Sequence, residues 1–240
     1  MPPMGGLERN SHGRFRCAAP GRMRHNPGAV LPRHCHRESF AAVVLAGGYD
    51  EAGDTGRHRV RAGEVIFHRA FESHLDLFHG PGAEVLVIPL PPAWKGSVLG
   101  HVRDPDALVR ASETDPPEAL HLLGVSVDER YPEVIDWPDA LADAIRLDPS
   151  ICLATWAQDK GLHPGSLSRG FMSVFGTTPA AYRRTQRARK AIEALTFTDI
   201  PLTALALDCG FADQAHMSRE VAKLAGAAPT LLRSSSRARA

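Results

Sequence analysis

The stretch Gly210-Phe211-Ala-Asp-Gln-Ala-His-Met-Ser218-Arg219 decides the fold of the C-terminal half, because an earlier stretch of the chain repeats its pattern. The earlier copy is Gly161-Leu-His-Pro-Gly-Ser-Leu-Ser168-Arg169. The glycines Gly161 and Gly210 are 49 residues apart, and the two Ser-Arg pairs are 50 apart because the second turn is one residue longer. An internal repeat indicates architecture more firmly than local propensity does.

Each copy predicts a helix, a turn and a second helix, over about residues 151–172 and 200–222. The shared positions of the first copy are Ile151, Leu153, Trp156, Ala157, Leu167, Phe171, Gly176 and Pro179; those of the second are Ile200, Leu202, Leu205, Ala206, Met217, Val221, Gly226 and Pro229. Gly161 and Gly210 are expected to end the first helix of each copy with left-handed backbone. The result is a helix-turn-helix, whose second helix can enter a major groove of DNA.

The charge distribution favours an anionic partner for this half. Residues 1–147 hold 16 Lys and Arg against 20 Asp and Glu, a net charge of −4, whereas residues 148–240 hold the remaining 12 against 7, a net charge of +5. Residues 179–195 predict one long basic helix that sets the separation of the two units. The alternative is that the surplus charge is an ordinary solvated surface, but two copies of a Ser-Arg pair in a basic half-chain favour DNA binding.

Residues from about Trp137 to Arg233 resemble the DNA-binding domain of AraC-type (AraC/XylS) transcription regulators. The stretch from Gly210 to Arg219, followed by Gly226 and Pro229, carries the resemblance. It implies binding to promoter DNA and control of transcription, more often activation, with RNA polymerase as a partner. The chain departs from the family at Met217 and Val221, where larger aromatic residues are usual, and at Gly165, where many members project a base-contacting side chain. We therefore expect looser packing in the second unit and fewer bases contacted by the first.

The resemblance also assigns roles to individual side chains. The expected base contacts are Ser168, Arg169, Gln214, His216 and Arg219. Arginine can bind guanine O6 and N7 through two hydrogen bonds, and glutamine can bind adenine N6 and N7 in the same way. The expected phosphate contacts are Arg183, Arg184, Arg187, Arg189, Lys190 and Lys223, with helix-surface pairing as the alternative for those on the basic helix. For every one of these residues the alternative is a solvated surface position.

Residues 25–95 predict an antiparallel β domain, because short apolar runs such as Phe40–Leu45 and Glu84–Leu90 are separated by Gly and Pro turns. The expected fold class is α+β with two domains, an N-terminal antiparallel β-barrel followed by an all-α domain. The other expected segments are an unstructured lead at 1–24, a helical connector and candidate dimerisation region at 96–135, the DNA-binding domain at 136–233 and a frayed tail at 234–240. Asp-Pro pairs in the connector are typical of helix starts.

Gly28, followed after five residues by His34-Cys35-His36 and some forty residues later by His74, resembles the cupin barrel, a jelly roll that is a frequent effector domain in AraC-type regulators. Metal-binding cupins use two His, a Glu and a later His, so the implied ligands of a divalent transition metal are His34, His36, Glu38 and His74. On a strand the first three would share a face, although Glu38 follows His36 too soon for the cupin spacing. Two alternatives stay open: the same side chains hold a small-molecule effector, or they are buried structural residues.

The composition is that of an ordinary soluble globular protein, with 43% apolar and 23% charged residues. No apolar run approaches the roughly 18 residues of a membrane helix, and no secretory signal is recognisable. The scattered cysteines, Cys17, Cys35, Cys152 and Cys209, fit a reducing cytoplasm. We expect a one-component transcription regulator, not an enzyme, that senses an effector in its barrel and is a candidate homodimer. The alternatives are a metal-dependent cupin enzyme fused to a DNA-binding domain and a constitutive DNA-binding protein with a dimerisation barrel.

Overall fold

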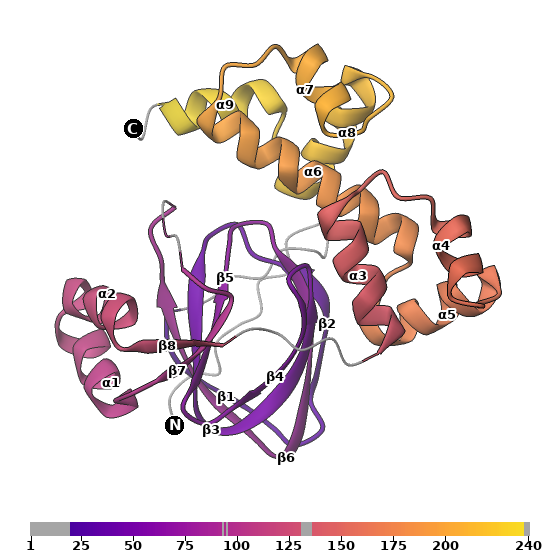
Figure 1. Ribbon diagram of the computed structural model, residues 1–240. Helices are drawn as coiled ribbons and strands as arrows, with labels where there is room; N and C mark the ends of the chain where they lie inside the picture. Colours follow the sequence, from indigo (N-terminus) through magenta and orange to yellow (C-terminus); the bar gives the residue numbers. More distant parts are fainter. Residues whose placement is uncertain (1–19, 93, 95, 131–135, 238–240) are drawn as a thin grey trace. The chain divides into compact units, whose positions relative to one another are not determined.

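The protein is a β-sheet unit followed by a helical unit (Figure 1). The computed structural model describes residues 20–130, except 93 and 95, and residues 136–237. Contacts divide the chain into two compact units, Met1–Glu133 and Val134–Ala240. The predicted α+β class, an antiparallel sheet followed by helices, is therefore confirmed.

Unit 1 contains one curled antiparallel sheet. Its strands are β1 (Gly21–His25), β2 (Val30–Cys35), β3 (Phe40–Gly53), β4 (Gly56–Arg61), β5 (Glu64–His68), β6 (Ser73–Pro89), β7 (Leu99–Val102) and β8 (Val127–Arg130). They pair in the order β1-β6-β3-β5-β7-β8, while β2 pairs with β6 and β4 with β3. Within the described residues this path ends at β1 and β8, so the hydrogen-bonded ladder does not close on itself.

The sheet curls because its two long strands, β3 and β6, bend together. They pair along almost their whole length, and the register shifts between Val44 and Ala46 and again between Gly47 and Tyr49. Bulges of this kind bend a strand. Gly47 has a φ of 71°, and a Cβ at this position would collide with the carbonyl oxygen of Gly82. The bend therefore requires glycine at position 47.

Both faces of the central strands are buried. Successive residues of a strand point to opposite faces, so Ala41 lies in one apolar cluster and Ala42 in the other. The cluster that contains Ala41 is covered by α1 (Pro105–Thr114) and α2 (Pro116–Val125), and Leu108 packs into it. Burial on both faces explains why β3 begins with a continuous apolar run and not with an alternating one.

The structure differs from the sequence prediction at three segment boundaries. The predicted helical connector, 96–135, contains α1 and α2 but also β7 and β8, which extend the sheet from β5. The predicted lead, 1–24, includes most of β1, while residues 1–19 lie outside the described residues. The predicted frayed tail is helical as far as Arg237. The missed strands are four or five residues long, too short for a recognisable period.

Unit 2 is helical in its described residues. Its helices are α3 (Trp137–Leu147), α4 (Leu153–Asp159), α5 (Pro164–Phe175), α6 (Pro179–Phe197), α7 (Leu202–Asp208), α8 (Gln214–Ala225) and α9 (Pro229–Arg237). The pair α4–α5 and the pair α7–α8 are the two copies of the repeat, and α6 connects them (Figure 1). Phe171, Phe175 and Tyr182 pack ring against ring in the core between α5 and α6, and all three are fully buried.

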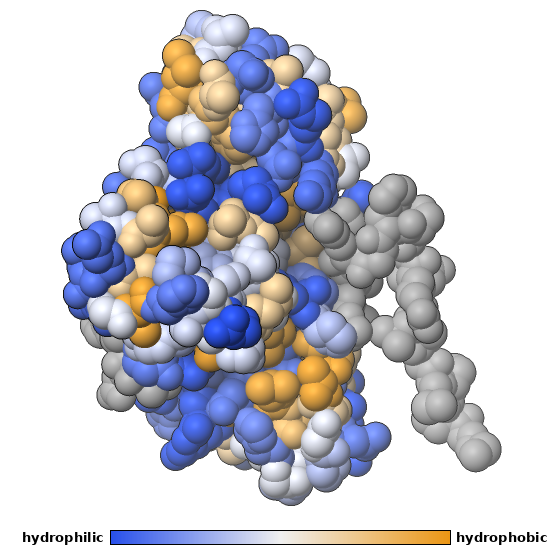
Figure 2. Space-filling view, turned by 90° about the vertical axis from the view of Figure 1, so that its right-hand side faces the viewer, coloured by the Kyte–Doolittle hydropathy of each residue, from blue (hydrophilic) through white to orange (hydrophobic). Residues whose placement is uncertain are grey.

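On the face drawn in Figure 2, apolar residues form small groups separated by polar ones. Such groups are normal, because apolar atoms contribute more than half of the surface of a folded protein. None of the helices that the structure describes is long and apolar enough to cross a membrane.

Candidate nucleic-acid interface and histidine cluster

The turns of the two helix-turn-helix units have the same backbone geometry. Gly161 and Gly210 have φ values of 64° and 77°. In the first turn the N–H of Leu162 donates to the carbonyl of Ala157 (2.8 Å), and in the second the N–H of Phe211 donates to that of Ala206 (2.9 Å). These are the long-range bonds of a Schellman cap, which needs a left-handed residue at its centre. The prediction that the two glycines end the first helices is confirmed.

Helix α5 has a buried face and an exposed face. Leu167 and Phe171 point into the core, while Arg169 is exposed and Ser168 is half-buried beside it. A Cβ on Gly165 would lie 3.2 Å from Nη1 of Arg169, so the guanidinium group folds back over the first turn of the helix. The missing side chain at position 165 thus leaves room for Arg169 at the helix start.

Helix α8 repeats this arrangement. Met217 and Val221 are fully buried, Gln214 is half-buried and Arg219 is exposed. The helix starts at Asp213, whose carboxylate accepts a hydrogen bond from the N–H of His216 (2.6 Å). Exposed arginines therefore occur at the same place on both second helices.

His216 differs from the other expected base contacts. Its ring packs edge to face against the buried ring of Phe211, with the centroids 5.3 Å apart. This contact joins the turn to the start of α8 and gives His216 a structural task, whether or not its outer edge also contacts a base.

The cations of α6 contact other parts of the helical unit. Arg183 donates to the carbonyl of Ile151 (3.0 Å), and Arg187 donates twice to that of Pro149 (3.0 and 2.7 Å). Lys190 donates to the carbonyl of Asp208 (3.3 Å). Three of the six expected phosphate contacts thus bind backbone within the unit. This geometry favours the helix-surface alternative for them.

The remaining three expected phosphate contacts are Arg184, Arg189 and Lys223. Arg184 lies 4.0 Å from Glu220, Arg189 donates to Gln186 (3.5 Å), and Lys223 is exposed on α8. A pair as long as that of Arg184 constrains the side chain little. Arg184 and Lys223 are therefore the better candidates for phosphate among the six.

The repeat also contains an equivalence that the sequence prediction missed, between Arg183 and Arg233. Arg233 on α9 donates to the carbonyl of Ile200 (2.7 Å), as Arg183 on α6 does to that of Ile151. Ile151 and Ile200 are equivalent, and each arginine follows an equivalent proline by four residues. Aligning the copies as far as the helix after each unit would have revealed the pair.

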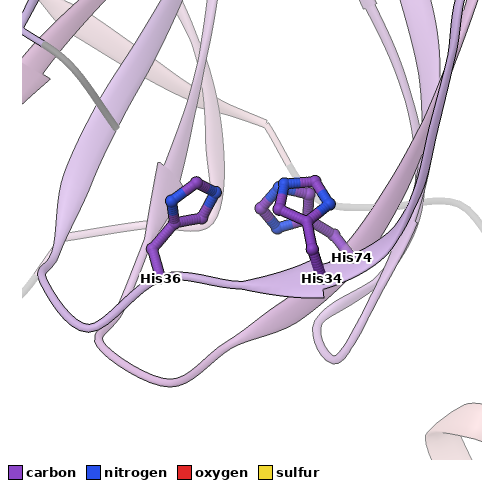
Figure 3. Close-up of side chains that lie close together, drawn as sticks. All are labelled: His34, His36 and His74. Carbon is purple, nitrogen blue, oxygen red and sulfur yellow. The ribbon is translucent and has the colours of Figure 1, made fainter. Parts of the chain in front are cut away.

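The histidines His34, His36 and His74 converge within the curl of unit 1 (Figure 3). His34 and His74 are direct cross-strand partners on β2 and β6, and their ring centroids are 4.4 Å apart. His36 lies 4.9 Å from His34 and 5.3 Å from His74. All three are at most 7% exposed. The structure thus brings together three of the four side chains that the cupin resemblance implied.

Glu38 is the exception, because it is exposed and does not belong to the cluster. Strand β2 ends at Cys35, so the alternation that would have placed Glu38 beside the histidines ends there too. The segment after β2 is held by a bond from the N–H of Phe71 to the carbonyl of His36 (2.7 Å). Phe71 has a φ of 64°, a strained value for a bulky residue. This strained turn fixes His36 near His74.

Two further side chains complete the cluster, Glu51 on β3 and His68 on β5. Glu51, His68 and His74 have ligand-type atoms within 4.8 Å of one another, and all three are at most 5% exposed. The cupin resemblance gave neither Glu51 nor His68 the role of a ligand. The signal in the sequence was weak: polar residues within strands that otherwise appear buried.

Burial shifts the pKa values of Glu51, His68 and His74. It raises the pKa of Glu51 well above its ordinary value, and the nearby carboxylates of Asp76 and Glu72 add to the effect while Arg33 opposes it. It lowers the pKa of His68 and of His74, and neighbouring imidazoles add to that shift. The two rings are therefore neutral at pH 7, the form in which imidazole binds a metal or accepts a hydrogen bond.

The duplicated motif, with an exposed arginine on each second helix, defines unit 2 as a helix-turn-helix unit of the DNA-binding class. Residues 156–235 match a family model described as a helix-turn-helix domain. The resemblance to AraC-type regulators is confirmed, because the chain aligns with the arabinose operon regulatory proteins of two bacteria. It is 32% identical over 117 residues to that of Escherichia coli. It is 33% identical over 86 residues to that of Salmonella typhimurium.

These alignments are partial. The first covers 48% of this chain and 37% of the E. coli protein. The second covers 36% of this chain and 31% of the Salmonella protein, so the chain spans about a third of the relatives' length. ToxT from Vibrio cholerae has a TM-score of 0.43 at 8% identity, covering 88% of this chain and 96% of that one. The C-terminal domain of AraT, a response regulator from Geobacillus stearothermophilus, has a TM-score of 0.40 at 21% identity, covering 43% and 88%.

Proposed function

We propose that the protein is a one-component transcription regulator that binds promoter DNA through unit 2 and senses an effector in unit 1. The observation that carries the proposal is the duplicated helix-turn-helix with Arg169 and Arg219 exposed at equivalent positions of α5 and α8. The names of the aligned relatives, which are operon regulatory proteins, support it.

In this proposal α5 and α8 enter major grooves and contact base edges. The contacting side chains are Ser168, Arg169, Gln214, His216 and Arg219. Two units joined by a single helix suit two successive grooves on one face of DNA, about one helical turn or ~34 Å apart. The family resemblance supplies two further expectations: the protein activates transcription, and it contacts RNA polymerase.

For unit 1 we propose a cupin-like jelly roll with an effector site at His34, His36 and His74. Its core segment is 25–95, and β7 and β8 extend the sheet. The region 96–135, through α1 and α2, is a candidate dimerisation surface. A metal ion or a polar small molecule would suit a group of buried imidazoles. The alternative of a metal-dependent enzyme rests on the same cluster, but the aligned relatives bear the names of regulators.

The proposal can be tested by selecting bound sites from random duplex DNA with the full chain. We expect one enriched site with two conserved parts about 10 base pairs apart, one for each unit. The Arg169→Ala/Arg219→Ala double variant is the matched control and should lose the enrichment, because both changes are at exposed positions and leave the cores intact. A wild-type chain that enriches no site would contradict the proposal. Repeating the affinity measurement with candidate metals and small molecules separates a sensor from a constitutive DNA-binding protein.

A further inference from the structure

Glu51, His68 and His74 form a second possible ligand group in unit 1, which shares His74 with the group of three histidines. The three residues come from β3, β5 and β6, and β3 pairs directly with each of the other two strands. Their exposed fractions are 2%, 5% and 4%. A rigid sheet thus holds one carboxylate and two imidazoles together away from solvent.

The distance within this group suits two ligands of one ion. Nε2 of His68 lies 3.4 Å from Oε2 of Glu51, which is longer than the roughly 2.7–3.2 Å of an ordinary N–H···O bond. Two ligand atoms about 2.05 Å from a tetrahedral ion are roughly 3.3 Å apart. The pair is therefore spaced more like ligands than like a donor and an acceptor.

Two buried polar atoms in the group have no hydrogen-bond partner among the described residues. These atoms are Oε2 of Glu51 and Nδ1 of His74. Buried polar atoms are normally satisfied, so each exception calls for an explanation. A second carboxylate lies beside the group, because Asp76 is the direct cross-strand partner of Glu51 and its Oδ2 lies 3.8 Å from Nε2 of His74. A cation between the three side chains would satisfy the carboxylate and balance the charge.

As a deepening of the proposed sensor function, on which it rests, we propose that unit 1 binds one divalent transition-metal ion through Glu51, His68 and His74. One carboxylate with two imidazoles is a common ligand set for zinc and for ferrous iron, and it leaves a coordination position open. His34 and His36, whose rings lie 4.4 and 5.3 Å from that of His74, flank the ion. The carboxylate that the cupin resemblance sought at Glu38 is thus supplied by Glu51.

The test uses the full untagged chain, stripped of metal with a chelator and titrated with Co²⁺, whose visible absorption reports coordination by protein nitrogen. We expect binding of one equivalent, displaced by Zn²⁺. Glu51→Gln and His68→Gln should each weaken Co²⁺ binding at least tenfold and change the spectrum. Glu38→Gln is the matched control, because this exposed carboxylate lies outside the group, and it should bind as the wild type does. Undiminished binding by Glu51→Gln, or no binding by the wild type, would overturn the proposal.

A stability measurement separates a ligand from a structural residue. Without metal, Glu51→Gln should melt no lower than the wild type, because the substitution removes a buried acid that lacks a compensating partner. With metal, only the wild type and Glu38→Gln should gain melting temperature. A metal-free Glu51→Gln that melts much lower would make Glu51 a structural residue. Loss of binding in His36→Ala but not in Glu51→Gln would place the ion among the three histidines instead.

DNA binding, measured on the same samples, distinguishes this proposal from the proposed function. A chain that selects a DNA site but binds no metal overturns the metal site and leaves the regulator intact. A chain that binds Co²⁺ but selects no DNA site overturns the proposed regulator function and leaves the metal site intact.

Discussion

Two arginines link parts of the helical unit through its backbone. Arg183 and Arg233 each extend from the helix after a helix-turn-helix to the carbonyl of the isoleucine before it. Arg187 reinforces the first of these links through Pro149. Each link joins the helix that follows a unit to the residue that precedes the unit's first helix. The basic residues of α6 therefore serve the fold, in addition to the DNA binding that we propose for this unit.

Arg187→Ala should destabilise the helical unit. Its guanidinium group makes two hydrogen bonds, at 3.0 and 2.7 Å, to the carbonyl of Pro149, and it is half-buried. Losing charged hydrogen bonds of this kind costs about 1.5–3 kcal/mol of unfolding free energy, measurable by urea denaturation followed by circular dichroism. Arg184→Ala, which breaks only a 4.0 Å pair at the surface, should change the stability by less than about 0.5 kcal/mol. Equal stability of the two variants would show that the Arg187 link is not maintained in solution.

The sequence predicts which residue types gather, but not which way a long side chain turns. The exposure of Arg169 and Arg219 follows from helical spacing, and the convergence of His34 with His74 follows from a known pattern. Whether Arg187 contacts a phosphate or a carbonyl depends on the loop at Pro149, 38 residues away. Glu51 and His68 were missed for a similar reason: only the pairing of β3 with β5 and β6 brings them to His74.

At the scale of elements, α5 and α8 are the equivalent second helices of the two repeats, but they differ in the side chains that they carry. On α5 the guanidinium of Arg169 lies over Gly165, whereas on α8 Arg219 is accompanied by Gln214 in the first turn. In the proposed complex with DNA, α8 would thus offer more hydrogen-bonding groups to base edges than α5.

The short strands β7 and β8 were not predicted from the sequence. Pairing with neighbouring strands, and not a periodicity of their own, makes these segments strands.

Arg219→Ala should weaken binding to the selected DNA site by about 1–3 kcal/mol and relax base preference at one position. The reason is that an exposed arginine on the second helix can bind guanine through two hydrogen bonds. Lys223→Ala is the comparison, because its exposed ammonium group on the same helix suits phosphate. It should weaken binding to all DNA sequences alike. It should also lower the slope of log K against the logarithm of the salt concentration by about one. Fluorescence anisotropy at several salt concentrations gives both quantities, and an unchanged preference in Arg219→Ala would contradict the placement of α8 in a groove.

At the scale of the whole molecule, each unit has a core of its own. Unit 1 buries two apolar clusters on the faces of its sheet, and unit 2 buries Phe171, Phe175 and Tyr182 together with one face of α3. An effector in unit 1 can act on DNA binding only by favouring one state of the chain over another. The sequence predicted this division from the change of periodicity and charge, since both properties are averages over many residues and do not depend on particular contacts.

A fragment of residues 136–240 should fold alone as a helical domain and select the same DNA site as the full chain. It keeps Asp136, which starts α3 through a capping box with Asp139, and Trp137, whose ring lies against Gly170 of α5. A fragment of residues 149–240 is the matched control: it retains both repeats but lacks α3, whose Leu141 and Ile145 are fully buried. Because deletion exposes the apolar surface that α3 covers, the shorter fragment should melt at a lower temperature and less cooperatively. Circular dichroism melting and the site selection check both expectations. If the longer fragment stayed unfolded, the two units would depend on each other for folding, and an effector would act through a shared core.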